Sequence, residues 1–185
     1  MMLRRITYIL IMLSFSCGDG YDERMEKATK EFDKNTSEDQ RKLVDNFFSG
    51  NFKYEDSKSP NIEGGFYCLW KRRDMSIKPH LALNERFIEN GYSITTNSEK
   101  LKFIIINETI SHVVGHYGDG GTASKLENVA TIVDLDKSKY YLLFRNMGSN
   151  PPSSVTTKAG RQSIGIGSYL NDDQLYTRLT SFISK

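Results

Sequence analysis

Residues 101–146 constrain the fold more than any other segment, because they combine long β-branched runs with two turn signals. The run LKFIIINETISHVVGHY is dense in Ile and Val and leads into GDGG, residues 118–121, which is typical of a hairpin turn. The runs LENVATIVDLD and KYYLLFRN follow, and the short stretch DKS lies between them. Together these features predict a three-stranded antiparallel meander.

Signals for a further strand and two helices flank this meander. The continuous apolar run GGFYCLW predicts a strand buried on both faces, and YSITT predicts a short strand. The stretch KPHLALNERFIENG predicts a helix with Pro79 in its first turn and Gly91 after its last. The stretch NDDQLYTRLTSFISK predicts a terminal helix opened by Asn171 or Asp172. We therefore expect residues 64–185 to form a single compact α+β domain, with a mainly antiparallel sheet and helices packed on one face.

The N-terminal segment has the pattern of an export signal. Arg4 and Arg5 precede an apolar run, Ile6–Phe15, which is far shorter than the roughly 20 residues of a membrane span. The stretch LSFSC that follows resembles the lipobox of bacterial lipoproteins, in which the cysteine receives the lipid and becomes the first residue of the mature protein. The resemblance implies a signal peptide over residues 1–16 and lipidation of Cys17. The alternative is a secreted protein that is cut near Ser16.

The residues after Cys17 indicate where in the cell the protein is expected to be. Gly18 instead of Asp at the next position resembles lipoproteins sorted to the outer membrane, and the acidic cluster of Asp19, Asp22 and Glu23 is similar to surface-export tags of Bacteroidetes lipoproteins. These resemblances imply a lipid-anchored protein of the bacterial outer membrane that faces the periplasm or the cell surface. Acidic residues beside a tether also keep it solvated, so the surface-export interpretation has a simpler alternative.

Residues 17–63 are poor in apolar side chains, which predicts a lipid-anchored tether with a helical segment. The helix is expected over residues 37–50, where Ser37 and Gln40 match a capping box and Gly50 suits the end.

Charge and cysteine content exclude several classes of function. The chain has 25 Lys and Arg against 23 Asp and Glu, and removal of residues 1–16 takes away two arginines and no acid. A formally neutral mature chain has no global field for nucleic acid, so no nucleic-acid partner is expected. Cys68 is the cysteine left after Cys17 is lipidated, so no intrachain disulfide can form, and its apolar neighbours predict a buried thiol.

His112 and His116 are the most suggestive pair of candidate ligands, but the stretch HVVGH predicts a strand instead of a helix. Residues four apart on a strand lie about 13 Å apart, so the two imidazoles cannot share one ion. We therefore expect no metal site. A weaker hypothesis is that a neighbouring strand brings Asp119, Glu108 or Asp134 beside one histidine, which would allow acid–base chemistry.

The loop MGSNPPSS is a second candidate contact region, because consecutive prolines are excluded from a sheet interior and surface loops often carry binding residues. The candidate ligand or partner contacts are therefore His112, His116, Asp119, Asn150, Pro151 and Pro152. The sequence has no phosphate-binding loop and no nucleophile elbow, so no catalytic residue and no cofactor are predicted.

The layout NGYSITTNSEKLKFIIIN, followed by a DLD-type hairpin, resembles small envelope lipoproteins of the ABC-transport auxiliary and TolB amino-terminal types. The resemblance covers roughly residues 64–185 and implies a non-enzymatic accessory or binding component of the cell envelope, with an envelope protein or a small ligand as partner. One alternative is a small hydrolase or metal-dependent enzyme that uses His112, His116 and nearby carboxylates. Another is an immunity or inhibitor lipoprotein.

Overall fold

The computed structural model describes residues 19–58, 60–71, 76–155 and 161–184. Cys17 and the export signal lie outside these residues. The helices are α1 (Asp19–Asn35), α2 (Glu38–Phe48), α3 (Leu81–Glu89) and α4 (Asp172–Leu179), and a short 3₁₀ turn, η1, spans Thr180–Phe182. The strands are β1 (Gly65–Lys71), β2 (Ile77–Pro79), β3 (Leu101–His116), β4 (Thr122–Asp134), β5 (Lys139–Met147) and β6 (Ile164–Ile166).

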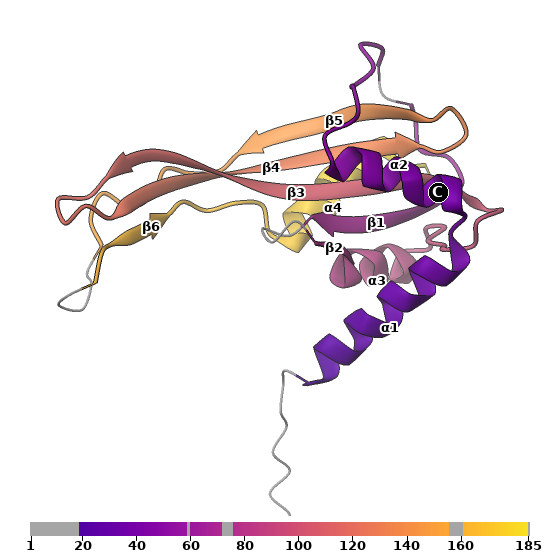
Figure 1. Ribbon diagram of the computed structural model, residues 1–185, viewed down its shortest axis with the longest axis horizontal. Helices are drawn as coiled ribbons and strands as arrows, with labels where there is room; N and C mark the ends of the chain where they lie inside the picture. The colour runs from indigo at the N-terminus through magenta and orange to yellow at the C-terminus, as the bar shows by residue number, and fades with distance from the viewer. Residues whose placement is uncertain (1–18, 59, 72–75, 156–160, 185) are drawn as a thin grey trace, which may run out of the picture.

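The strands form one mixed sheet in the order β2-β1-β3-β4-β5, and β6 pairs with β4 (Figure 1). Antiparallel pairing joins β1 to β2, β3 to β4 and β4 to β5, whereas β1–β3 and β4–β6 are parallel. The predicted meander of β3, β4 and β5 is therefore confirmed, as is the single α+β domain with a mainly antiparallel sheet.

Helices cover both faces of this sheet, which corrects the expectation that they would pack on one. On one face, α3 and α4 bury Phe87 and Leu175 against Ile105. On the other, α1 and α2 bury Phe32 and Phe47 with the sheet residues of a second cluster. The physical reason lies in β1 and β3, whose consecutive apolar residues point alternately to the two faces, so both faces need a cover.

The segment expected to be a tether is largely part of the folded domain. The capping box of Ser37 and Gln40 opens α2 as predicted. However, α2 buries Val44 and Phe47, and α1 buries Phe32, so neither helix is a free spacer. The few apolar residues of this segment suffice because Met25, Phe32, Val44 and Phe47 are all buried.

The chain closes on itself near the start of β1. The Ile62 amide donates to the Phe182 carbonyl at 2.9 Å, and the Ser184 amide donates to the Ile62 carbonyl at 3.0 Å. Ile62 is fully buried between these residues. The segment before β1 and the end of the chain therefore form one parallel bridge.

Two local predictions are wrong. Pro79 belongs to β2 instead of a first helical turn, and α3 begins at Leu81. The stretch expected as a strand at residues 92–96 makes a single bridge, from Ile94 to Phe66. In both places pairing with β1 decides the local conformation. Among the described residues, no helix is both long and apolar enough to cross a membrane.

Candidate functional site

The distal half of the β3–β4 hairpin projects from the body of the molecule (Figure 1). We call this region the arm and define it as residues 109–126 together with β6. The pairing of β1 with β3 ends at Glu108, and the pairing of β5 with β4 ends at Glu127. Beyond Glu108, no strand of the described residues pairs with the β1-side edge of β3. The arm therefore carries an open strand edge eight residues long, from Thr109 to His116.

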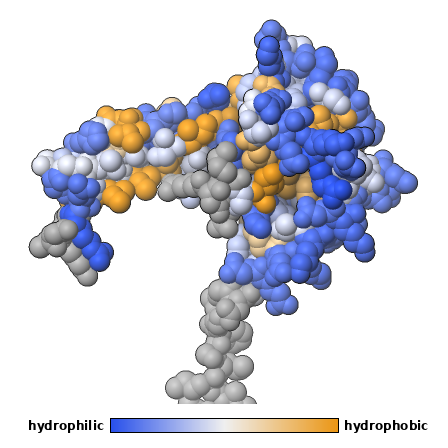
Figure 2. Space-filling view, in the orientation of Figure 1, coloured by the Kyte–Doolittle hydropathy of each residue, from blue (hydrophilic) through white to orange (hydrophobic). Residues whose placement is uncertain are grey.

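Several large aliphatic side chains are exposed on the arm (Figure 2). Val113 is 60% exposed and Val114 is 55% exposed, and on β6 the values are 66% for Ile164 and 44% for Ile166. Single exposed apolar residues need no explanation, but several on one projecting element are typical of an interaction surface. We call these four residues the arm patch.

A β-bulge at Val114 changes the direction in which the arm side chains point. The register pairs His112 with Lys125 and Val113 with Ser124, then resumes with Gly115 opposite Ala123 and His116 opposite Thr122. Directly opposed residues share a face, and the extra residue shifts the alternation by one. His112 and His116 therefore lie on opposite faces of the sheet, which excludes a shared ion more firmly than their spacing did.

His112 belongs to a charged cluster at the base of the arm. Its Nε2 lies 2.9 Å from Oε2 of Glu127, and Nη1 of Arg145 lies 3.3 Å from Oε1 of the same carboxylate. The Glu127 side chain is only 8% exposed. Burial raises the pKa of Glu127, but hydrogen bonds from His112 and Arg145 outweigh it and hold the pKa below its ordinary value. This arrangement neutralises a buried charge and stabilises the sheet.

The carboxylates predicted to approach a histidine have other partners. Glu108 pairs with Lys71 at 3.1 Å, and Asp134 pairs with Lys137 at 3.1 Å. Asp119 accepts hydrogen bonds from Ser163, and these, with the bond from the Gly121 amide, lower the pKa of Asp119. That hypothesis is therefore wrong in its choice of residue, because Glu127 is the acid beside His112. Across the described residues, no three His, Cys, Asp or Glu side chains are placed to hold a metal ion.

The proline loop folds back onto the arm. The hydroxyl of Tyr117 donates to the carbonyl of Pro152 at 2.6 Å, and the amide of Ser149 donates to the carbonyl of Ser168 at 3.2 Å. The carboxylate of Asp119, in the hairpin turn, accepts a hydrogen bond from the amide of Ser163, which directly precedes β6. These contacts hold the loop carrying Asn150, Pro151 and Pro152 beside the arm.

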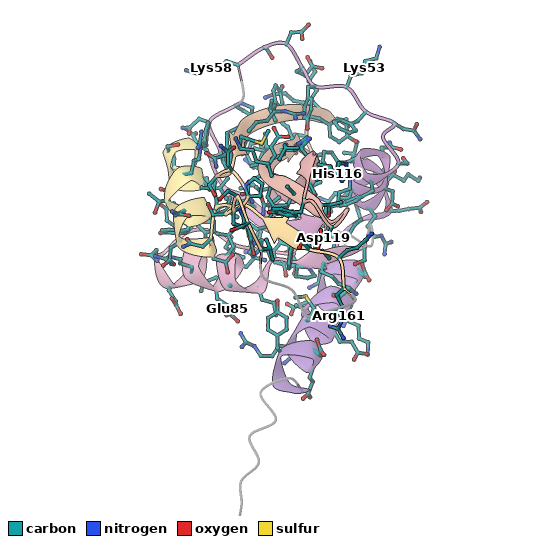
Figure 3. The ribbon with its side chains drawn as sticks, turned by 90° about the vertical axis from the view of Figure 1, so that its left-hand side faces the viewer. Lys53, Lys58, Glu85, His116, Asp119 and Arg161 are labelled. Atoms are coloured by element: carbon teal, nitrogen blue, oxygen red, sulfur yellow. The ribbon has the colours of Figure 1, made fainter. Side chains whose placement is uncertain are left out.

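The predicted contact residues therefore gather in one region, with His112 at its base. Figure 3 looks along the arm and shows His116 and Asp119 at the end nearest the viewer. The sequence did not point to three features of this region, namely Glu127, Arg145 and the exposed isoleucines of β6. The polar residues of ENVATIV do not alternate regularly, so nothing there marked Glu127, and the isoleucines stand in a stretch, SIGIGS, that has no strong strand signal.

Comparison of the sequence with protein-family models finds no match, and a search of curated proteins finds no similar protein.

Proposed function

We propose that this protein is a lipid-anchored component of the cell envelope that binds a protein partner through the arm and catalyses no reaction. The observation that carries the proposal is the arm patch, which exposes four large aliphatic side chains on an element that projects from the body. Burial of such side chains in an interface would contribute roughly 25 cal/mol per Å² of apolar surface.

The open edge of β3 offers a second means of binding. An extended segment of a partner can add to such an edge through main-chain hydrogen bonds, and pockets for alternate side chains then give specificity. Natural proteins usually protect a free edge with charge, a bulge or a cover. Here the bulge at Val114 interrupts the edge, but Val113 and Val114 remain exposed. We infer that a partner covers this edge.

The enzyme alternative has less support in the geometry. The two histidines lie on opposite faces, and the carboxylate beside His112 is already paired with Arg145. An acid–base pair needs a cleft where substrate can reach it, and four pockets of the described residues, which lie beside α1, α2, α3 and α4, are lined by neither His112 nor His116.

The experiment that tests the partner hypothesis is crosslinking in the native envelope, followed by purification in detergent and mass spectrometry. Val113→Lys and Ile164→Lys should each abolish recovery of a partner that the unchanged protein retains in near-equal amount. The matched control is Ile88→Lys on α3, because Ile88 is 57% exposed and lies off the arm. A partner that tolerates both arm substitutions, or that Ile88→Lys also removes, would contradict the assignment. An incoming toxin as that partner would identify an immunity protein.

The anchor is tested separately. Growth with an alkyne-labelled fatty acid should label the unchanged protein, and Cys17→Ala should abolish the label and release the protein from the membrane fraction. Stable anchoring requires more than one acyl chain, each buried methylene contributing about 0.8 kcal/mol. Label that persists in Cys17→Ala would show that the lipid lies elsewhere.

A further inference from the structure

A small pocket of about 180 Å³ lies on the α3 and α4 face of the sheet, away from the arm patch. Its floor is formed by adjacent residues of three strands, since Trp70 pairs with Asn107 across β1 and β3, and Thr109 pairs with Asn128 across β3 and β4. Its wall includes His80 before α3 and Asp172 at the start of α4. The pocket is smaller than sites for drug-sized ligands, which are typically about 300–1,000 Å³.

One polar atom in this pocket has no partner. Asn107 is 4% exposed, and its side-chain oxygen, Oδ1, accepts no hydrogen bond. Among the buried side-chain polar atoms of the described residues, this oxygen alone is unsatisfied. A buried acceptor without a donor costs roughly 1–3 kcal/mol, so a molecule in the pocket that donates to this oxygen would recover that free energy.

Two of the neighbouring polar side chains, Asn128 and His80, are engaged with other groups. Asn128 accepts a hydrogen bond from the Leu170 amide at 2.9 Å and donates to Thr109 Oγ1 at 3.4 Å. His80 Nε2 faces Oδ1 of Asp172 at 3.6 Å. Burial lowers the pKa of His80 in spite of this carboxylate, so the imidazole is neutral at pH 7.

The buried lining is therefore neutral, and the one carboxylate, on Asp172, is 57% exposed at the rim. A neutral lining does not select a cation, but it suits hydroxyl groups, which donate and accept hydrogen bonds. The indole of Trp70 adds an aromatic surface whose negative face attracts C–H groups. We propose that this pocket binds a neutral, hydroxyl-bearing ring, such as one sugar residue, with a hydroxyl donating to Oδ1 of Asn107.

Trp70 is the single tryptophan of the chain, so its fluorescence reports on the pocket directly. The full-length protein, in a detergent without a sugar head group, would be titrated with glucose, galactose, mannose and N-acetylglucosamine, and binding would be checked by ligand-observed NMR. We expect a saturable change for at least one sugar, with a dissociation constant of about 1 mM or below. No response to any of the four, or a response to ethylammonium alone, would overturn the proposal.

Two variants connect the signal to the pocket. Asn107→Leu removes the unsatisfied oxygen at nearly constant shape, so it should weaken sugar binding at least about tenfold while raising the melting temperature of the unliganded protein. Ala82→Phe places a ring at the exposed rim of the pocket and should block binding without altering the fold. The matched control is Ile88→Phe on the same helix, which should bind normally. Unchanged affinity in Asn107→Leu, or in Ala82→Phe, would overturn the proposal, as would a lower melting temperature for Asn107→Leu, because water would then be the donor.

Discussion

The two halves of β3 differ in burial although both are rich in β-branched residues. From Phe103 to Asn107 every side chain is buried, whereas from Ser111 to Val114 every side chain is exposed. The first half lies between β1 and β4 with helices on both faces, and the second half has one partner strand and no helix. The comparison teaches that the covering helices and strands, and not the composition of β3, decide whether its isoleucines and valines are buried in the core or exposed on the arm.

The largest expected effect is a difference in unfolding free energy between substitutions in the two halves of β3. Ile105→Ala should lower the free energy of unfolding by about 2–5 kcal/mol, because Ile105 is fully buried and the substitution leaves a cavity. Val113→Ala should change it by less than about 0.5 kcal/mol. Denaturant unfolding of both variants in the same detergent measures the difference. Equal losses would show that the arm patch is covered within the molecule.

A smaller effect is expected at the boundary between body and arm. Glu127→Gln should lower the free energy of unfolding by about 1 kcal/mol at pH 7, because the hydrogen bonds from His112 and Arg145 lose their charge assistance. The pKa of Glu127 is depressed in the folded state, so its contribution is present above the ordinary value of 4.5 and is lost as pH falls through the folded pKa. Unfolding measured from pH 7 to pH 3 should show the two proteins converge. A constant difference would contradict the role of the charge.

His80 should produce a pH effect in a different range. Its folded pKa is lowered by burial, so the unfolded chain takes up a proton first as pH falls through the ordinary value of 6.5, and the protein loses stability from there down to the folded pKa. His80→Gln should show a flatter stability profile over this range. The same slope in both proteins would assign the loss to another group.

The smallest effect is confined to the arm. Asp119→Asn weakens the link between the hairpin turn and Ser163, so amide hydrogen exchange should become faster in residues 117–121 and 161–168. The exchange rates of buried amides in β1 should not change, and neither should the midpoint of global unfolding. A fall in that midpoint would mean that the arm and the body unfold as one cooperative unit.

The sequence predicted the meander, the capping box of Ser37 and the terminal helix because each depends on local periodicity and turn chemistry. It did not predict that α1 and α2 pack on the sheet. The few apolar residues of these helices can be recognised as a packing surface only when the face of β3 that they cover is known. It placed His116, Asp119 and Pro152 correctly in loops or at strand ends, but their proximity depends on how residues 148–155 and 161–168 lie beside the arm. The bulge at Val114 and the pairing of His112 with Glu127 follow from strand register, which the sequence pattern left undetermined.

The bridge of Ile62 to the end of the chain bears on how the protein reaches its folded state. Ile62 precedes every strand, yet its two backbone hydrogen bonds are made with Phe182 and Ser184. A chain that emerges from its N-terminus therefore cannot complete this bridge until residue 184 has appeared. Helices α1 and α2 are synthesised first, but their apolar residues can be buried only after β3, β4 and β5 have been synthesised. The bridge at Ile62 spans more than 100 residues of sequence, so it is a long-range contact that forms late in folding.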